Sequence, residues 1–382
     1  MAEIEHMGGM VQCIANRENI LYAVDCFRHN LPKALDILAE TVLSPTFPEE
    51  ELEESRVIVG LQRDDLPSEI LSRDLVQQAA YLKQPIGNPH YCPLNKINDI
   101  TAAKLHAFRA KYFVGENCYI AASGVDHKEF VSLVQSRFQS LPRGNTDDLV
   151  MRPSVYTGGL ITEQRELKEP FVKLALAFEV GGWSSDTLVP SCVMQMLLGG
   201  GKSFSAGGPG KGMYTRLYTQ VLNRFYWAES VESFVTIFEQ SGLLGIDGAC
   251  PPENVPNMIA TIVEQFCILA HFEVSEEELT RAKNMLKSTM MMQLESRLVV
   301  CEDIGRQFST YGKRELPEVV CEKIDAVTAK DLMEVAGLML EKPPAVACIG
   351  HDVSQISPYE VIANFTKQVN QEVWKKAKAG KK

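Results

Sequence analysis

An internal repeat constrains the fold of this chain more than any other feature of its sequence. Short stretches of the first half recur in the second half, in the same order, at an offset of 226 or 227 residues: PEEEL at 48–52 and SEEEL at 275–279, ITAAK at 100–104 and VTAK at 327–330, IAASG at 120–124 and VACIG at 346–350. A fourth pair, NLP at 30–32 and NVP at 254–256, recurs at 224 residues. Because chance matches do not keep such a register, we infer that one structural unit has been duplicated.

The duplicated unit combines hairpins with helices. Apolar residues around a turn at 16–19 predict a hairpin of strands 11–15 and 20–26, and residues 118–123 are predicted as a buried strand. Helical spacing predicts helices over 31–43, from 48 onward, and over 70–82, 101–113 and 127–138. In the second half, 171–180 is a predicted strand and 225–238 and 243–250 a predicted hairpin. We therefore predict an α+β fold with two repeated domains, each a mostly antiparallel sheet packed by helices.

The predicted domain boundaries follow from the repeat and from a break in periodicity. Residues 141–160 gather Pro, Gly and Asp and are predicted as a linker between a first domain, 1–140, and a second domain, 161–370, with a basic tail at 371–382. The first copy has no counterpart of about fifty residues at 171–224. We expect the first domain to be incomplete, and therefore the less stable of the two.

Composition and charge limit the partners of this chain. Lys and Arg number 38 and Asp and Glu 49, so the net charge of −11 disfavours nucleic acid and suits basic ligands. No apolar stretch approaches the roughly 18 residues that a transmembrane helix requires. The ten cysteines occur singly, which predicts reduced thiols. The first residues, MAEIEHMGG, resemble neither a secretory signal nor an Arg-rich transit peptide.

The second half contains a glycine-rich stretch, Gly199 to Gly212, with seven glycines in fourteen residues between two predicted helices. Glycine leaves the backbone free, so a connection of this kind is either functional or disordered. We predict that it binds substrate, whereas a surface insertion without a role is the alternative that composition allows. The candidate substrate-binding residues are Gly199, Gly200, Gly201, Lys202, Phe204, Ser205, Gly207, Gly208, Gly210, Lys211 and Gly212.

Nucleotide binding is not predicted for this stretch. A Walker A motif requires a glycine five residues before Gly-Lys-Ser, and Met196 stands at that position before Gly201. The second Gly-Lys, at Gly210, is followed by Gly212 instead of Ser or Thr. A dinucleotide fingerprint would need different glycine spacing after a buried strand.

The sequence shows no catalytic constellation. No two of the seven histidines lie within five residues of each other, which excludes both His-Glu-x-x-His and His-x-x-Glu-His zinc motifs. A Gly-x-Ser-x-Gly nucleophile motif is also absent. Acidic runs such as 49–54 are better explained as helix starts than as acid/base pairs. We predict no catalytic and no metal-binding residue in this chain.

The residues GGGKSFSAGGPGKGMYTRLYTQVLNRFYWAES, with NPHYCPLNKI at 88–97 and the closing strand at 345–350, resemble the pitrilysin-like (M16) metallopeptidase family. The resemblance covers nearly the whole chain and is strongest to the α subunits of heterodimeric mitochondrial members. It implies a pitrilysin/LuxS-like metallohydrolase fold, in which two repeats form a half-clam and two subunits enclose a chamber for an extended presequence. In that family the catalytic β subunit carries zinc in an inverted His-x-x-Glu-His motif.

That motif is absent here, and its place in the first repeat falls within the missing residues. The resemblance therefore implies a non-catalytic subunit without a cofactor of its own, which binds the presequences of imported precursor proteins for cleavage by the zinc-bearing β subunit. It also implies a location in the mitochondrial matrix, with inner-membrane association left open, and an N-terminally truncated form that lacks the transit peptide. Two alternatives are a structural core subunit of a respiratory complex with the same fold and a truncated chain that has lost function.

Overall fold

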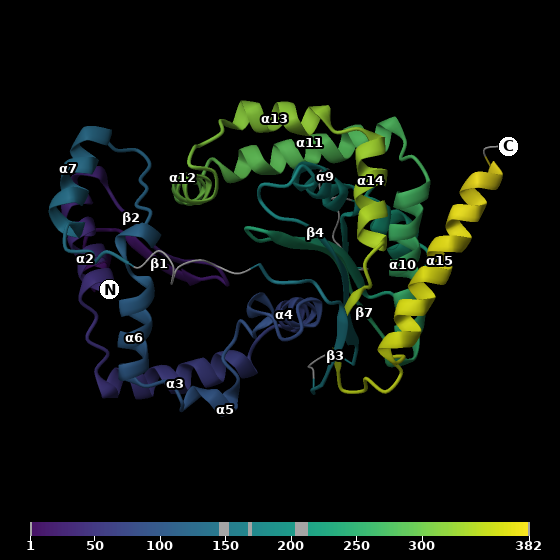
Figure 1. The fold of residues 1–382 in the computed structure, drawn as a ribbon, viewed down its shortest axis with the longest axis horizontal. Helices are drawn as coiled ribbons and strands as arrows, with labels where there is room; N and C mark the ends of the chain where they lie inside the picture. Colours follow the sequence, from purple (N-terminus) through teal and green to yellow (C-terminus); the bar gives the residue numbers. More distant parts are fainter. Residues whose placement is uncertain (1, 145–152, 167–169, 203–212, 381–382) are drawn as a thin grey trace. The chain divides into compact units, whose positions relative to one another are not determined.

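The computed structural model describes residues 2–144, 153–166, 170–202 and 213–380 (Figure 1). The chain forms two compact units, each assembled from three separate stretches. Unit 1 comprises Met1–Asp65, His90–Arg152 and Met291–Glu315, and unit 2 comprises Leu66–Pro89, Pro153–Met290 and Leu316–Lys382. The domain boundaries proposed from the sequence stay predictions.

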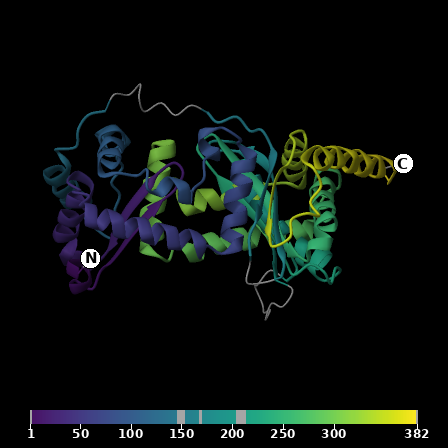
Figure 2. The same ribbon diagram turned by 90° about the horizontal axis from the view of Figure 1, so that it is seen from below.

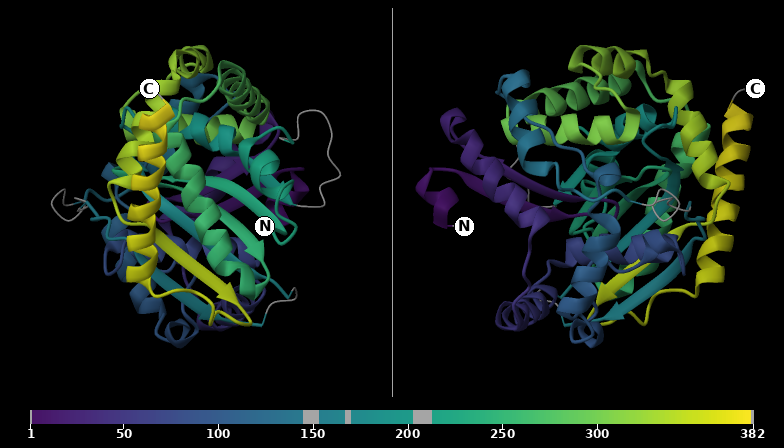
Figure 3. Two further views of the ribbon diagram at one scale, coloured as in Figure 1. Left: turned by 90° about the vertical axis from the view of Figure 1, so that its right-hand side faces the viewer. Right: turned by 60° about the vertical axis from the view of Figure 1, so that its left-hand side comes forward.

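Unit 2 contains a sheet of six strands in the order β3-β8-β4-β7-β6-β5 (Figure 3). Only β3 and β8 run parallel, and the other neighbours are antiparallel, as the fold prediction required. The strands are β3 Gly159–Gln164, β4 Val172–Gly181, β5 Gly200–Lys202, β6 Ser230–Ile237, β7 Ser241–Cys250 and β8 Ala345–Gly350.

One face of this sheet carries the large apolar side chains. Along β4, Leu174, Leu176 and Phe178 are fully buried in one core cluster because alternate residues of a strand point to the same face. The helices that contribute to this cluster are α9 Leu188–Leu198, α10 Val255–His271, α11 Glu276–Gln293, α13 Pro317–Ala326, α14 Ala329–Leu340 and α15 Tyr359–Gly380. The predicted basic tail thus continues α15 as helix to Gly380 (Figure 2).

The opposite face of the sheet is covered by α4, Ser68–Ala80. Here the strands present small residues, including Ala175, Ala177 and Ala347, which let the helix approach closely. Leu71 and Val76 of α4 are buried against them, and the helix is followed by Tyr81, whose hydroxyl bonds to Ser241 of β7. The small strand residues and the large helix residues therefore complement each other.

Unit 1 has a smaller sheet, formed by the hairpin β1 Met10–Ala15 and β2 Ile20–Asp25. Its helices are α1 Ala2–His6, α2 Leu31–Leu43, α3 Glu49–Asp64, α5 Leu94–Ile97, α6 Ala102–Tyr112, α7 His127–Phe138 and α12 Arg297–Tyr311. The predicted hairpin and the helices predicted over 31–43, 101–113 and 127–138 are confirmed within one or two residues. Short helical turns in unit 1 are Arg28–Asn30 and Gly115–Asn117, and those in unit 2 are Pro85–Gly87, Tyr218–Leu222 and Pro252–Asn254.

The two copies of the repeat exchange one helix. Shifted by the repeat offset, α4 falls on α12, so the two helices are equivalent. Helix α4 comes from the first copy but belongs to unit 2, whereas α12 comes from the second copy and belongs to unit 1. Each unit therefore contains a helix that the other copy supplies.

The prediction of a buried strand at 118–123 is wrong. These residues form no strand, and their side chains are half-buried or exposed. Their equivalent in the second copy is β8, which is held between β3 and β4. Among the described residues of unit 1, the strands β1 and β2 pair with each other and neither flanks this segment, so its backbone joins no sheet.

Within the described ranges, no single helix is long and apolar enough to cross a membrane. The helices Pro252–His271 and Glu276–Gln293 reach the length and hydropathy of a span only as a pair, and this pair is bent by 108°.

The packing of α4 predicts a strong contrast between two neighbouring residues. Leu71 is 1% exposed and Ile70 is 44% exposed. We expect Leu71→Ala to lower the free energy of unfolding by about 2–5 kcal/mol, because it leaves a cavity against the sheet. Ile70→Ala should change it by less than about 0.5 kcal/mol. Urea unfolding followed by circular dichroism measures both, and equal effects would show that α4 does not pack as described.

Candidate functional site

The glycine-rich stretch begins where α9 ends, and its first residues enter the sheet of unit 2. The sequence predicted a glycine-rich connection between two helices. In the structure Gly200 to Lys202 form the strand β5, which pairs with β6 at the edge of the sheet. Gly200 lies opposite Glu232 and Lys202 opposite Ser230. The stretch therefore starts from a fixed position.

Two of these glycines are required by the backbone. Gly199 has φ of 56° and Gly200 has φ of 117°, both in the region that residues with a side chain rarely adopt. A Cβ added to Gly199 would lie 2.3 Å from Cγ2 of Thr215, and one added to Gly200 would lie 2.0 Å from the carbonyl oxygen of Val231. In contrast, a Cβ on Gly201 would meet nothing within 4 Å.

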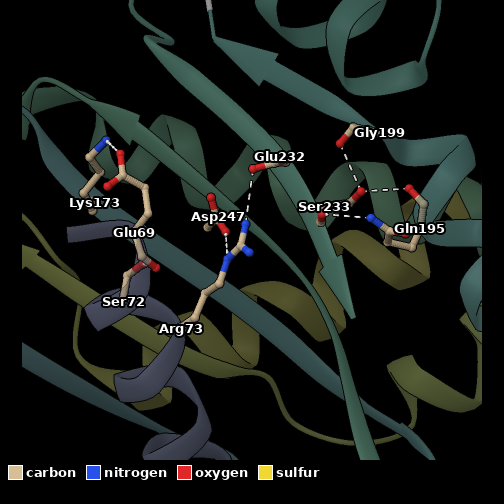
Figure 4. Close-up of polar contacts among 9 residues, drawn as sticks. All are labelled: Glu69, Ser72, Arg73, Lys173, Gln195, Gly199, Glu232, Ser233 and Asp247. Carbon is tan, nitrogen blue, oxygen red and sulfur yellow. Dashed lines mark hydrogen bonds and ion pairs between the residues drawn. The ribbon is translucent and has the colours of Figure 1, made fainter. Parts of the chain in front are cut away.

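Ser233 holds the start of the stretch from β6 (Figure 4). Its backbone N–H donates to the carbonyl oxygen of Gly199 at 2.8 Å, and its Oγ lies 3.0 Å from the same oxygen and 2.8 Å from the carbonyl oxygen of Gln195. Nε2 of Gln195 donates in return to the carbonyl oxygen of Ser233 at 3.3 Å. The orphan carbonyls at the end of α9 are thereby satisfied.

A residue that follows the stretch is bonded to its start. The backbone N–H of Gly200 donates to Oγ1 of Thr215 at 3.1 Å, which links the second residue of the stretch to the segment after it. The next residue, Arg216, is 6% exposed and pairs with both carboxylate oxygens of Glu278 on α11, at 2.9 and 2.8 Å. A turn of π-helix follows at Tyr218–Leu222, in place of the regular helix predicted from Met213.

A charged network lies on the other face of β6, toward α4 (Figure 4). Arg73 of α4 donates from Nε to Asp247 of β7 at 2.6 Å and from Nη2 to Glu232 of β6 at 3.2 Å. One turn earlier on α4, Glu69 accepts from Nζ of Lys173 on β4 at 2.8 Å. Helix α4 is thus held to three strands by ion pairs as well as by its apolar side chains.

Burial and ion pairing act against each other on the two carboxylates of this network. Burial raises the pKa of Asp247 above its usual value, and the neighbouring Arg73 offsets only part of that rise. Burial also acts to raise the pKa of Glu69, but the hydrogen bond from Lys173 and a backbone N–H outweigh it and hold that pKa below its usual value.

The structure describes four of the eleven predicted substrate-binding residues, Gly199, Gly200, Gly201 and Lys202, and places them together at β5. The other seven lie outside the described residues: Phe204, Ser205, Gly207, Gly208, Gly210, Lys211 and Gly212. Sequence reasoning missed Ser233, Arg216 and the network around Arg73. Asp247 did carry a signal, because it is the lone charge inside the otherwise apolar strand β7, whereas Lys173 shares β4 with Glu179.

The ligand set that a metal ion needs is not found among the described residues. No set of three His, Cys, Asp or Glu side chains among them is placed to hold a metal ion. Burial raises the pKa of Cys192 to about 11 and the pKa of Cys250, Cys267 and Cys348 to about 12, so these thiols stay protonated at neutral pH.

Comparison with known proteins shows two family models that match this chain. Residues 1–94 match the family model "Insulinase (Peptidase family M16)", and residues 99–286 match "Peptidase M16 inactive domain". The mitochondrial-processing peptidase subunit alpha of Bos taurus is 34% identical over 374 residues, which is 94% of this chain and 71% of that protein. The subunit of the same name from Solanum tuberosum is 36% identical over 95% of this chain and 72% of that protein.

A solved structure shares the fold at lower identity. A chain of "Complex III2 from Candida albicans, Inz-5 bound" superposes with a TM-score of 0.80, over 94% of this chain and 86% of that chain, at 16% identity.

The geometry at β5 predicts different tolerance at adjacent glycines. Gly200→Ala should destabilise unit 2 by about 1–3 kcal/mol, because it combines a strained φ with a clash against the carbonyl of Val231. Gly201→Ala is the matched control and should be neutral within about 0.5 kcal/mol. Thermal unfolding and hydrogen exchange of the β6 amides measure the difference. A neutral Gly200→Ala would mean that β5 does not hold the backbone described here.

The Arg73 network predicts a pH-dependent loss of stability. Because burial raises the pKa of Asp247, its charged form is a cost to the folded state that grows as pH rises through the carboxyl range. Arg73→Met removes the compensating cation, and we expect a loss of about 1–3 kcal/mol at neutral pH. The loss should shrink in mildly acidic buffer, where Asp247 is protonated.

Urea unfolding at both pH values measures this effect. The double variant Arg73→Met/Asp247→Asn is the control, since it removes the carboxylate that needs the cation, and it should recover stability at neutral pH. A loss that is the same at both pH values would contradict the electrostatic explanation.

Proposed function

The chain belongs to the M16 peptidase family, and we propose that it is the non-catalytic, substrate-recognising subunit of a mitochondrial processing peptidase. In this role it binds the presequences of imported precursor proteins in the mitochondrial matrix, and a partner β subunit carries the zinc and cleaves them. The observation that carries the proposal is the similarity to α subunits of that peptidase over 94% of the chain.

The proposal assigns zinc to the partner because the described residues of this chain do not fit the metal. A catalytic zinc needs three protein ligands from His, Cys, Asp or Glu, and no such group is assembled among the described residues. The sequence also lacks any pair of histidines at helical spacing. We therefore derive no step of hydrolysis from residues of this chain.

The anchoring of the glycine-rich stretch supports a role in recognition. Ser233 and Thr215 hydrogen-bond its start, at Gly199 and Gly200, and the buried Arg216–Glu278 pair fixes the segment that follows the stretch. A segment that contacts many different presequences must adapt to them, and it can do so without loss of position when its ends are fixed. Presequences are basic, and a chain with a net charge of −11 attracts them over a distance.

A structural role is the second candidate. The chain superposed from complex III has the same fold, and at 16% identity this likeness concerns the fold alone. A structural core subunit would assemble with partners but would have no affinity for presequences. Presequence binding therefore separates the two candidates.

We expect the chain to bind a catalytic β subunit and to restore cleavage of a presequence-bearing precursor. Alone, the chain should cleave nothing and contain far less than stoichiometric zinc, because no set of zinc ligands is assembled among its described residues. Co-purification, a cleavage assay and metal analysis by plasma mass spectrometry measure these properties. Stoichiometric zinc in the isolated chain, or cleavage without the β subunit, would refute the proposal.

Variants at β5 connect this activity to the site. In the reconstituted enzyme, Gly200→Ala should raise KM for the precursor with little change in kcat, since the catalytic residues lie in the partner. Gly201→Ala should leave KM unchanged. Assembly with the β subunit in the absence of any presequence affinity would favour the structural role.

A further inference from the structure

Helix α3 of unit 1 has the reverse of the usual amphipathic pattern. Its inner side carries Leu52, Arg56 and Gly60, which lie one turn apart. Leu52 is buried, the guanidinium of Arg56 donates to the carbonyl oxygen of Ile100 at 2.8 Å, and a Cβ on Gly60 would lie 3.9 Å from Ile97 of α5. This side fixes α3 to its own unit.

The outer side of α3 exposes large apolar side chains. Val57, Ile58 and Leu61 are 58%, 53% and 59% exposed, and their spacing places them within one turn on one face. A surface helix normally turns its apolar residues toward the core. Three exposed apolar residues within one turn therefore indicate a surface that meets a partner.

The charges around these three residues have one sign. Glu50 and Glu54 precede the apolar group on the same face, and Asp65 follows it one turn beyond Leu61; all three residues are exposed. Both arginines of the helix, Arg56 and Arg63, fall on the inner side, in the helical row of Leu52. The outer face thus combines an apolar centre with acidic ends and contains no basic residue.

We propose that the outer face of α3, defined by Glu50, Glu54, Val57, Ile58, Leu61 and Asp65, docks a basic amphipathic helix. Within the proposed function, on which this inference rests, the occupant is a presequence docked as a helix, a step distinct from the extended binding in the chamber that the family resemblance implies. Its apolar side covers Val57, Ile58 and Leu61, while its Lys and Arg side chains reach the carboxylates at both ends of the face. This deepens the proposed function by adding a recognition surface in unit 1 to the anchored stretch in unit 2.

The chemistry of the face selects this occupant. A basic peptide without an apolar side would satisfy the carboxylates but leave the three apolar residues exposed. A neutral apolar helix would cover them but bury no counter-charge, and acidic partners are repelled. Only a ligand that is both basic and amphipathic matches both parts, which is the composition of a presequence.

Two variants of the intact chain, each in complex with the β subunit, separate the two parts of the face. Val57→Ser/Leu61→Ser removes apolar contact area, and Glu54→Lys/Asp65→Lys reverses the charge. The matched control is Phe108→Ser, because Phe108 is 48% exposed on α6, a helix with basic residues and no acidic ones. The probes are a fluorescent presequence peptide and a scrambled peptide of the same composition that cannot form an amphipathic helix.

Fluorescence anisotropy should show that the unaltered complex binds the presequence peptide more tightly than the scrambled peptide. The apolar variant should lose at least about tenfold in affinity and also lose that preference. The charge variant should lose a similar factor and bind with a weaker dependence on salt. Phe108→Ser should leave the affinity unchanged. A photoreactive residue in place of Leu61 should crosslink to the presequence peptide.

Three results would overturn the inference. Unchanged affinity in both α3 variants, with no crosslink from position 61, would leave the proposed function intact but remove α3 from it. Loss of co-purification with the β subunit in the α3 variants would assign the face to the subunit interface. Absence of presequence binding by the unaltered complex would reject the proposed function and this inference together. Circular dichroism of each variant confirms that its helices are retained.

Discussion

The packing of α4 against the small-residue face of the sheet is the contact on which unit 2 depends. Alanines on β4 and β8 would leave this face without a core of its own, and Leu71, Leu75 and Val76 of α4 supply the missing apolar volume. Helix α4 comes from the first copy of the repeat but packs in unit 2. Its counterpart α12 comes from the second copy but packs in unit 1. Neither copy can therefore complete its unit without the other, and duplication has produced two interdependent halves.

Strand β6 connects helix α4 to the start of the glycine-rich stretch. Glu232 and Ser233 are neighbours on β6, so their side chains point to opposite faces of the sheet. Glu232 bonds to Arg73 of α4 on one face, and Ser233 bonds to Gly199 and Gln195 on the other. The position of β6 is consequently set from both sides, which fixes the start of the stretch although half of its own residues are glycine.

The sequence predicted what depends on local pattern and on the repeat. The hairpin at β1 and β2, the helix over 31–43 and the antiparallel sheet of the second half follow from periodicity. The lone charge of Asp247 marked its strand, but its pairing with Arg73, 174 positions away, could not be read from local sequence. Ser233 has no distinguishing local pattern, and its role follows only from its contact with Gly199. The segment 118–123 has the composition of a strand, but a strand needs neighbours, and composition does not reveal their absence.

Charge alone could not make such a chain selective. At physiological ionic strength the field of exposed carboxylates is screened within about 8 Å, so a net charge of −11 steers basic ligands without distinguishing among them. Selectivity requires contacts that remove apolar surface from water at the same place where charges pair. On the outer side of α3 these two requirements meet on one helix face, where the apolar residues lie between carboxylates toward both ends of the helix and the arginines lie on the inner side. The outer face carries only negative charge because the arginines lie on the inner side. There Arg56 forms ion pairs with Glu49 and Glu53 and donates a hydrogen bond to the carbonyl oxygen of Ile100.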